Sequence, residues 1–357
     1  MGALHQAIAI LGLLLPFLGL LVNGDDHKME LASCDIYNGR WVYDNSYPLY
    51  HSSQCHFIEM PFDCQRNGRP DDVYLRYRWK PFACDLPRFS AVDFLERFRN
   101  KKIVFVGDSM SLNQWQSLTC MLHSQSPHTG LVKEREEGLS KFTFLDYNVS
   151  IIMERNALLV EIAKKSKGDV LNLGSIADDD AQRWRESDVL VFNSWHWWNH
   201  HGRKKPWDFI MDGDKLRKDM NRLVAYWKAL RTWARWVENN IDTAKTKIFF
   251  QGISPTHTDA SSWGNYNAKN CSEEKLPLPA SFHQKKPAAE VILERVIGIT
   301  SKRVHLLNIT RLSQLRKDAH PSVYGTTGHY GMDCSHWCLP GLPDTWNELL
   351  YAELIRN

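Results

Sequence analysis

The sequence predicts an α/β fold in three layers, with a mainly parallel sheet between helices and a cysteine-rich N-terminal segment stapled to it by disulfides. After residue 101, short apolar runs alternate with longer stretches of helical periodicity. Such alternation is typical of a parallel sheet covered by helices. Before residue 90, four of the eight cysteines lie among aromatic and turn-forming residues with little periodicity. We expect this segment to depend on the main body for its fold.

The first 24 residues resemble a targeting segment. Residues 7–22 form an almost unbroken apolar run, which is shorter than the roughly 20 residues that span a bilayer and contains Pro16. We predict a signal peptide over residues 1–24, with Val22 and Gly24 small enough for the cleavage pocket, or alternatively a short signal-anchor. Both place the rest of the chain in the secretory lumen or outside the cell.

Cysteine usage agrees with that compartment, because an even number of cysteines in an oxidising environment predicts four disulfides. The cysteines are Cys34, Cys55, Cys64, Cys84, Cys120, Cys271, Cys334 and Cys338. Three glycosylation triplets also agree with lumenal exposure and begin at Asn148, Asn270 and Asn308. A metal site at Cys334, His336 and Cys338 is the disfavoured alternative, and no metal is expected. A net charge of +3 is too small to indicate a nucleic-acid partner.

The chain divides at about residue 90 into the cysteine-rich segment, residues 25–90, and the α/β domain, residues 91–357. Strands are expected at residues 103–106, 142–153 with a partner at 158–162, 189–192, 248–250 and 304–307. Helices are expected at residues 90–99, 110–123, 214–241, 287–297 and 343–355. Ser90 and Asp344 are the expected caps of the first and last of these helices.

The longest predicted helix, residues 214–241, carries an apolar stripe whose members are spaced alternately by four and three residues. They are Leu216, Met220, Leu223, Trp227, Leu230, Ala234, Val237 and Ile241. A coiled coil has the same spacing, but a helix between strands is expected to pack on the sheet. We therefore interpret Met220 and Trp227 as core residues.

Ser109 is the candidate nucleophile, because it lies at the carboxyl end of a buried strand and the amino end of a helix. Ligands bind at such positions, and free backbone N–H groups can stabilise negative charge there. Gly107 allows a sharp turn because it lacks a Cβ. Gly107 and Asp108 are candidate oxyanion or substrate residues. The alternative is that Ser109 only caps the helix.

His336 is the candidate base, because a serine needs a base that is itself held by a third group. Among fifteen histidines, only His336 follows an aspartate, Asp333, by three residues. This spacing lets the carboxylate reach Nδ1 while Nε2 faces a serine. Disulfides at Cys334 and Cys338 would hold the loop in place. The alternative is a cystine-stapled surface loop in which Asp333 and His336 are incidental.

A second Asp and His pair, Asp318 and His320, is spaced one residue closer. It therefore lacks the separation of one turn that suits Asp333 and His336. We interpret this pair as structural or substrate-facing.

Residues 193–201 follow the predicted strand 189–192, at the same edge of the sheet as the nucleophile. Asn193 can donate its amide to an oxyanion, and Trp195 and His196 are candidate substrate contacts, the tryptophans as platforms for sugar rings. The alternative is that Trp195 and Trp197 pack in the core. The three histidines of this stretch lack an accompanying carboxylate, which disfavours a metal site.

With these residues in view, the chain resembles the plant trichome birefringence-like proteins, which belong to the PC-esterase group of GDSL/SGNH-like folds. The stretches that carry the resemblance are residues 34–42, 77–81, 107–109, 333–341 and 344–350. The resemblance implies an SGNH-hydrolase-like domain over residues 91–357. It also implies the disulfides Cys34–Cys84, Cys55–Cys120, Cys64–Cys338 and Cys271–Cys334.

The implied function is O-acetylation of a plant cell-wall polysaccharide (xylan, mannan or pectin) in the Golgi lumen. Ser109 would carry the acetyl group, His336 would be the base and Asp333 its orienter. An alternative is a secreted acetylesterase of pectin or xylan with the same three residues, since water can attack the acetyl-serine in place of a sugar. A second alternative is a non-catalytic wall-binding protein with the aromatic residues as its sugar platform.

No bound cofactor is implied, but an acetyl donor is required, either acetyl-coenzyme A or a lumenal acetyl carrier. The implied partners are the polysaccharide acceptor and a Golgi membrane protein that donates acetyl groups. The expected location is the Golgi lumen, as a type II membrane protein, or the cell wall after secretion. The secreted form is credible because only about a dozen residues separate the apolar run from Cys34.

Overall fold

The computed structural model describes residues 34–325 and 332–356. A seven-stranded sheet runs through it in the order β13-β12-β9-β3-β6-β5-β4. The first five strands in that order are parallel, and β5 and β4 continue the sheet as an antiparallel edge. The bounds are β3 Lys102–Gly107, β4 Leu131–Glu136, β5 Leu139–Phe144, β6 Val149–Arg155, β9 Val189–Phe192, β12 Lys247–Gln251 and β13 Val304–Leu307.

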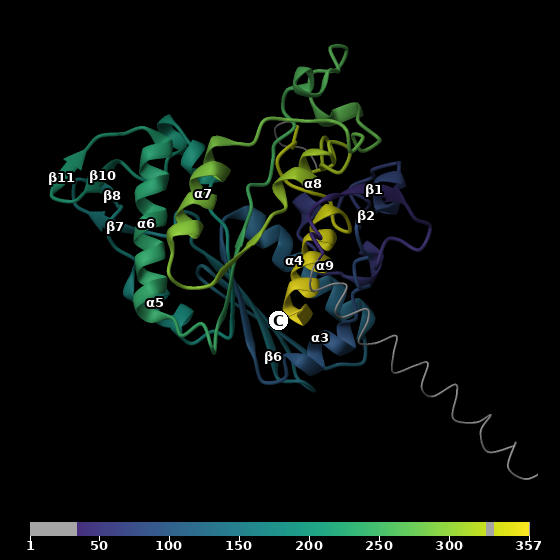
Figure 1. Ribbon diagram of the computed structural model, residues 1–357, viewed down its shortest axis with the longest axis horizontal. Coiled ribbons are helices and arrows are strands. Elements are labelled where there is room, and N and C mark those ends of the chain that lie inside the picture. The colour runs from purple at the N-terminus through teal and green to yellow at the C-terminus, as the bar shows by residue number, and fades with distance from the viewer. Residues whose placement is uncertain (1–33, 326–331, 357) are drawn as a thin grey trace, which may run out of the picture.

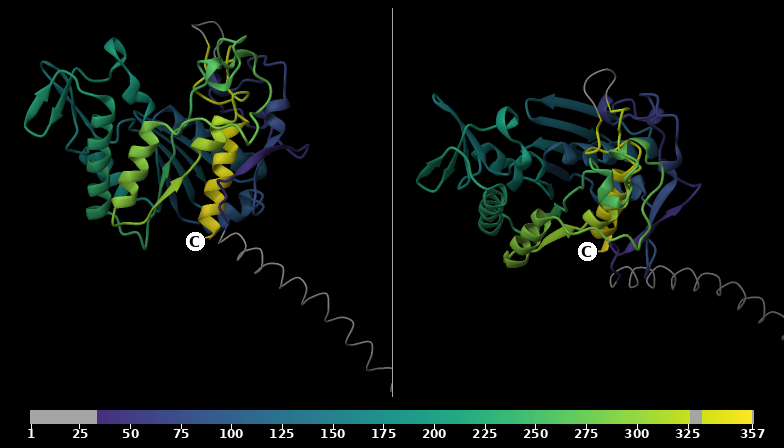
Figure 2. Two further views of the ribbon diagram at one scale, coloured as in Figure 1. Left: turned by 45° about the horizontal axis from the view of Figure 1, so that its top comes forward. Right: turned by 90° about the horizontal axis from the view of Figure 1, so that it is seen from above.

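Helices cover both faces of this sheet, which gives the predicted three layers (Figures 1 and 2). Successive residues of β3 point to opposite faces: Ile103 and Phe105 lie in one buried core, and Val104 and Val106 lie in the other. The first core includes side chains of α3 Ala91–Arg97, α4 Ser109–Gln125, α8 Thr310–Gln314 and α9 Leu342–Arg356. The second includes side chains of α5 Asp178–Arg185, α6 Arg222–Asn240 and α7 Ala288–Ile299.

Two smaller sheets accompany the main one. Four strands form the order β11-β10-β8-β7, and β1 pairs with β2 in the N-terminal segment. Their bounds are β1 Gly39–Tyr43, β2 Tyr77–Pro81, β7 Glu161–Lys165, β8 Gly168–Asn172, β10 Phe209–Asp212 and β11 Lys215–Arg217. Short 3-10 helices lie at Ser52–Gln54, Met60–Phe62, Val73–Arg76, His196–Asn199, Gly202–Lys204, Ala260–Trp263 and Cys271–Glu273.

Four disulfides join the chain, and they are the four pairs that the resemblance implies: Cys34–Cys84, Cys55–Cys120, Cys64–Cys338 and Cys271–Cys334. The second and third connect the N-terminal segment to α4 and to the loop before α9. The indole of Trp41 on β1 also donates to the backbone oxygen of Leu312 in α8, at 2.9 Å. The segment is therefore stapled to the main body, as predicted.

Most predicted elements are present. The strands predicted at 103–106, 189–192, 248–250 and 304–307 correspond to β3, β9, β12 and β13. The helices predicted at 90–99, 110–123, 287–297 and 343–355 correspond to α3, α4, α7 and α9. Ser90 caps α3 through its side chain, which accepts a hydrogen bond from the Asp93 N–H.

The single strand predicted at residues 142–153 is wrong, because the chain turns back at residues 145–148 between the antiparallel strands β5 and β6. Asn148 has a φ of 51° in this turn, a left-handed conformation that asparagine tolerates better than most residues. The predicted partner at 158–162 is also wrong. Its last residues begin β7, which pairs with β8 in the smaller sheet.

The long helix begins later than predicted, because the Asn221 side chain caps it at Arg222 by accepting from the N–H groups of Leu223 and Val224. Residues 215–217 form β11 instead, where Leu216 is 56% exposed. Trp227 is 41% exposed and Met220 is only partly buried, so the core assignment is wrong for Trp227. The buried face of the first turns consists of Ala225, Tyr226 and Ala229.

Asp344 does not precede α9 as a cap but lies in its first turn. Its buried carboxylate accepts from the Gly341 N–H at 2.8 Å and from the Ser117 hydroxyl of α4 at 2.6 Å. Asp344 therefore joins α9 to the helix that carries Ser109.

Among the described residues, no helix combines the length and apolarity needed to cross a membrane. The signal peptide or anchor predicted for residues 1–24 lies outside the described residues. Of the three predicted glycosylation sites, Asn148 is exposed, whereas Asn270 and Asn308 are partly buried.

Candidate active site

Ser109 is the first residue of α4, directly after the buried strand β3 and Asp108. The cap of the helix is Asp108, whose Oδ1 accepts from the Met110 N–H at 2.9 Å. The same oxygen accepts from the Asn193 side-chain amide at 2.7 Å. The alternative that Ser109 is only a helix cap is therefore wrong. Its hydroxyl is left free for another partner.

Gly107 is required for space and not for an unusual backbone angle, because it is not among the described glycines with positive φ. A Cβ at this position would lie 2.5 Å from the backbone oxygen of Asn193, which is closer than real Cβ contacts come. The predicted turn is thus present, but glycine is needed there because the backbone directly after β9 comes so close. Oxyanion roles for Gly107 and Asp108 remain predictions.

The three predicted catalytic residues form one chain of hydrogen bonds, although 227 positions separate Ser109 from His336. The His336 Nε2 lies 2.7 Å from the Ser109 Oγ, and the His336 Nδ1 lies 2.8 Å from the Asp333 Oδ2. With the proton on Nδ1, the imidazole donates to Asp333 and accepts from the serine. These are the contacts that an activated serine nucleophile requires.

The surroundings of Asp333 keep its carboxylate ionised, so that it can stabilise a positively charged imidazole. Its Oδ1 accepts from the backbone N–H groups of Ser335 and His336, each at 3.0 Å. Burial by itself would raise the pKa of Asp333, but the hydrogen bond and charge of His336 and these backbone groups hold its pKa well below the usual range. The carboxylate therefore stays ionised at neutral pH.

The loop that carries Asp333 and His336 is held on both sides. Cys334 is joined to Cys271, and Cys338 is joined to Cys64. Because both loop cysteines are oxidised, they cannot provide thiolate ligands for the metal site considered as an alternative. Among the described residues, no group of three or more His, Cys, Asp or Glu side chains is arranged to hold a metal ion.

Asn113 joins this loop to α4, the helix that begins at Ser109. Its side-chain oxygen accepts from the Trp337 N–H at 2.9 Å, and its amide donates to the Trp337 carbonyl at 3.1 Å. Asn113 lies four residues after Ser109, on the same face of α4. This buried amide thus fixes the distance between the two halves of the site. Sequence reasoning missed it, because a lone asparagine in a helix has no pattern that reports its partner.

His320 is structural, which was one of its two predicted roles. It is buried and stacks on Trp337 with 3.8 Å between ring centroids. Its Nδ1 lies 2.6 Å from the backbone oxygen of His336, and its Nε2 lies 2.7 Å from the Nδ1 of His257. The companion Asp318 is paired with the buried Arg316. His257 was not predicted, because nothing in its sequence neighbourhood points to His320.

The residues after β9 have different environments. The Asn193 amide is buried and bonded to Asp108, as described above. Trp195 packs edge-on against Tyr226, with ring centroids 5.0 Å apart. The Nε2 of His196 lies 3.0 Å from the Ser254 carbonyl. The core-packing alternative therefore fits Trp195 but not Trp197, which is 36% exposed.

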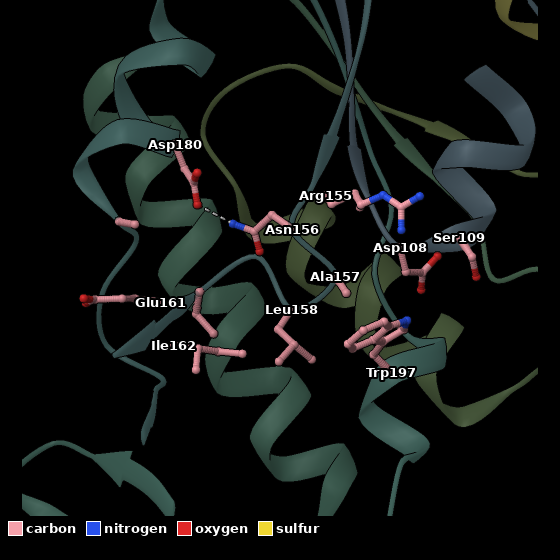
Figure 3. A pocket seen from close by; sticks show the side chains of 13 residues that line it. Asp108, Ser109, Arg155, Asn156, Ala157, Leu158, Glu161, Ile162, Asp180 and Trp197 are labelled. Atoms are coloured by element: carbon pink, nitrogen blue, oxygen red, sulfur yellow. Dashed lines mark hydrogen bonds between the residues drawn. The ribbon is translucent and has the colours of Figure 1, made fainter. Parts of the chain in front are cut away.

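A cavity of about 430 Å³ begins at Ser109. Its walls are the end of β6 with the loop that follows it, the first residues of β7, the start of α5 and Trp197 (Figure 3). This volume lies in the range of ligand pockets, about 300–1,000 Å³. An acetyl group on Ser109 would fill only a small part of it.

Two family models match the chain. The PC-Esterase model, a GDSL/SGNH-like acyl-esterase family found in Pmr5 and Cas1p, matches residues 86–353. The model of the PMR5 N-terminal domain matches residues 32–85. Together they span nearly all of the described residues.

Similar proteins come from Arabidopsis thaliana. Protein trichome birefringence-like 43 is 53% identical over 328 residues, which cover 91% of this chain and 89% of that protein. Protein trichome birefringence-like 38 is 52% identical and covers 92% of this chain and 85% of its own length. Protein trichome birefringence-like 40 is 47% identical and covers 99% of this chain and all of its own length (100%).

Proposed function

Because the chain belongs to the PC-esterase family and its trichome birefringence-like group, we propose that it transfers acetyl groups through an acetyl-Ser109 intermediate to hydroxyls of a plant cell-wall polysaccharide. The family makes it an enzyme of the acyl-transfer or esterase type. The observation that carries the finer proposal is the chain of hydrogen bonds from Ser109 through His336 to Asp333, with distances of 2.7 and 2.8 Å.

The first half-reaction loads the serine. The Ser109 Oγ attacks the carbonyl carbon of the acetyl donor while the Nε2 of His336 takes the hydroxyl proton. Asp333 stabilises the imidazolium that results. The Ser109 N–H, at the start of α4, has no acceptor among the described residues, so it is available to the developing oxyanion. Collapse of the tetrahedral intermediate breaks the bond to the donor, whose leaving atom takes the proton from His336.

The second half-reaction transfers the acetyl group from Ser109 to the sugar. A sugar hydroxyl gives its proton to the Nε2 of His336 as its oxygen attacks the acetyl carbonyl. The bond to the Ser109 Oγ then breaks, and the serine recovers the proton from the imidazolium. The net change moves one acetyl group from donor to sugar and leaves the enzyme as it began. The cavity beside Ser109 is where we place the acceptor.

A polysaccharide acetylesterase is the second candidate, and it is favoured by one observation. Ser109 is only partly buried, so water can compete with a sugar for the acetyl-serine. The same three residues would then release acetate from acetylated pectin or xylan. Whether the acceptor in the cavity reacts before water decides between transfer and hydrolysis.

The donor and the location follow from the same proposal. We propose acetyl-coenzyme A or a lumenal carrier as the donor, supplied by a Golgi membrane protein, and no resident cofactor. The four disulfides are typical of an oxidising compartment. Golgi lumen and cell wall both meet this condition.

The test is the fate of the acetyl group on Ser109. Purified protein is exposed to the donor, and peptide mass spectrometry locates the acetyl group. De-acetylated xylan, mannan or pectin oligomers are then added to one portion and buffer alone to another. We expect acetyl on Ser109 and faster loss to oligomer than to water, with acetylated sugar as the product. Equal loss to both, with free acetate, would identify an esterase.

Two variants serve as controls. Ser109→Ala should abolish both acetylation and product, whereas replacement of the exposed Ser281 by alanine should change neither. Polymer binding that survives Ser109→Ala, without turnover by the native protein, would identify a binding protein instead.

A further inference from the structure

Arg155 is an exposed arginine at the mouth of the cavity that begins at Ser109. It is the last residue of β6, where it pairs with Gly107, and its backbone N–H donates to the carbonyl oxygen of Gly138 at 2.8 Å. Its guanidinium makes no hydrogen bond or ion pair with any residue that the structure describes. In Figure 3 it extends from the strand toward Asp108 and Ser109. A guanidinium held beside a nucleophile without a partner is suited to an anion from solution.

The acidic side chains of the cavity already have partners. Asp180 accepts from the Asn156 amide at 2.7 Å and is paired with Arg183. Glu161 accepts from the Ser175 hydroxyl at 2.7 Å. The third acidic side chain, Asp108, caps α4 through its Oδ1, whereas its buried Oδ2 has no hydrogen-bond partner. Among the charged cavity residues that the structure describes, each carboxylate has at least one hydrogen-bond partner, and only the charged group of Arg155 has none.

Trp197 lies across the cavity from Arg155 in Figure 3. It is 36% exposed, and its ring lies against the ring of His200, with 5.2 Å between the centroids. An exposed indole face is an apolar platform on which the C–H side of a sugar ring can pack. The cavity thus offers an aromatic surface on one side and a cation on the other, both next to Ser109.

We propose that Arg155 and Trp197 form an acceptor subsite for a polysaccharide that carries uronate residues. Arg155 binds the carboxylate of a uronate through two parallel N–H···O bonds, and Trp197 packs on the sugar ring. The planar guanidinium matches a carboxylate, whereas a neutral xylan or mannan segment has no group of this charge. This proposal rests on the proposed function and names the substrate class of that site.

Two other anions compete for the same role. A donor such as acetyl-coenzyme A carries phosphates, and the tetrahedral intermediate carries an oxyanion on the acetyl group. If Arg155 stabilised the oxyanion, it would be necessary for every substrate, including a small neutral ester. If Arg155 bound the phosphates, it would be necessary only for the transfer of acetyl from that donor to Ser109. If Arg155 binds uronates, its contribution should grow with the number of charged carboxylates on the polysaccharide.

Binding to an inactive protein tests the subsite without any turnover. Ser109→Ala protein, with and without Arg155→Gln, is titrated with oligogalacturonate and with its methyl ester, in which a methyl group removes the charge of each carboxyl group. We expect Arg155→Gln to reduce the preference for the charged oligomer about 10- to 100-fold, and Arg155→Lys to reduce it less. The exposed Arg295 on α7 provides the matched control, and Arg295→Gln should leave the preference unchanged.

Kinetics then separate the three anions, with 4-nitrophenyl acetate as the neutral ester and acetyl-coenzyme A as the phosphate-bearing donor. An equal loss with Arg155→Gln on all substrates assigns Arg155 to the oxyanion and overturns the proposal. A loss confined to loading from acetyl-coenzyme A assigns it to the donor and also overturns it. Equal affinity of the inactive protein for the charged and methylated oligomers refutes the subsite, whether or not the enzyme is active.

Discussion

The two halves of the candidate active site are held in place by different means. Ser109 is placed by regular structure: the buried strand β3, the cap at Asp108 and the helix α4, all within a few residues of it. His336 lies in a loop that is placed by groups far away in the sequence, namely two disulfides, Asn113 and His320. The position of the proposed nucleophile is therefore set by the local chain, and the position of the proposed base is set by the assembled fold.

This difference has a consequence for chemistry. A serine on a strand and helix keeps its place as long as the core is folded. A base on a loop keeps its place only while each distant attachment holds, because an error of about 1 Å in position can cost about 10²-fold in rate. Substitutions around Ser109 and substitutions around His336 should therefore differ in how much they change activity and how much they change stability.

The largest effect is expected at the contact between the halves. Ser109→Ala or His336→Ala should lower kcat by about 10⁴- to 10⁶-fold. The two residues act as a unit, so the loss of either one removes most of the rate enhancement that they provide together. Thermal unfolding followed by circular dichroism should stay near that of the native protein, since both side chains are partly exposed. Acetate release from an acetylated oligomer measures the activity. Substantial residual turnover in His336→Ala would mean that another base serves Ser109.

Asp333→Asn tests the orienting group and should cost about 10⁴-fold in kcat, because the amide favours the wrong tautomer of the imidazole. It should also change the pH dependence of stability. The pKa of Asp333 is lowered in the folded protein, so its carboxylate stabilises the fold above its unfolded pKa, about 3.9. That contribution disappears as the pH falls through the lower folded pKa. Urea unfolding from pH 7 to pH 2 should show the native protein losing its advantage over Asp333→Asn in acid.

Removal of single disulfides separates the placement of His336 from the overall stability of the protein. Replacing Cys271 and Cys334 together by serine removes an attachment of the base loop, and replacing Cys34 and Cys84 removes a crosslink of similar length elsewhere, with sequence separations of 63 and 50. Each pair should cost about 2–4 kcal/mol in the free energy of unfolding. Only the first should lower kcat, by about 10- to 100-fold, in assays at a temperature where both proteins are folded. Equal losses of activity would mean that the loop disulfide contributes stability alone.

The smallest effect is expected for Asn113→Ala, which leaves the Trp337 N–H and carbonyl without partners. An unsatisfied buried group costs about 1–3 kcal/mol, and the loop can move relative to α4. We expect a loss of that size in the free energy of unfolding and about a 10-fold decrease in kcat. Asn113→Asp is the informative companion, since it keeps the acceptor for the Trp337 N–H and should retain more activity. Unchanged kcat in Asn113→Ala would show that the disulfides suffice to place His336.

Sequence reasoning succeeded where the signal is periodic or rare. The apolar run before Gly107 indicated β3, and the alternation of strands and helices indicated the layers. Asp333 and His336 were found because no other histidine in the chain follows an aspartate by three residues. The start of the long helix was missed, since residues 214–221 continue the same apolar spacing and only the cap at Asn221 ends it.

Other features were out of reach for a physical reason. Burial depends on the opposing surface, so Trp195 and Trp197 differ in the structure although they lie two residues apart. The need for glycine at position 107 comes from the backbone of Asn193, directly after β9. In the same way, the free guanidinium of Arg155 is visible only once the hydrogen bonds of the carboxylates around it have been assigned.

By itself the sequence predicted the four disulfides, the three-layer architecture, the family and the three residues proposed to carry the reaction. It did so because spacing, cysteine count and motifs report on the local chain and on shared ancestry. Only the tertiary structure decided that Ser109, His336 and Asp333 lie within hydrogen-bonding distance, and that a cavity opens beside them between Arg155 and Trp197. Distances between segments far apart in the chain follow from packing and crosslinks, and no local pattern encodes them.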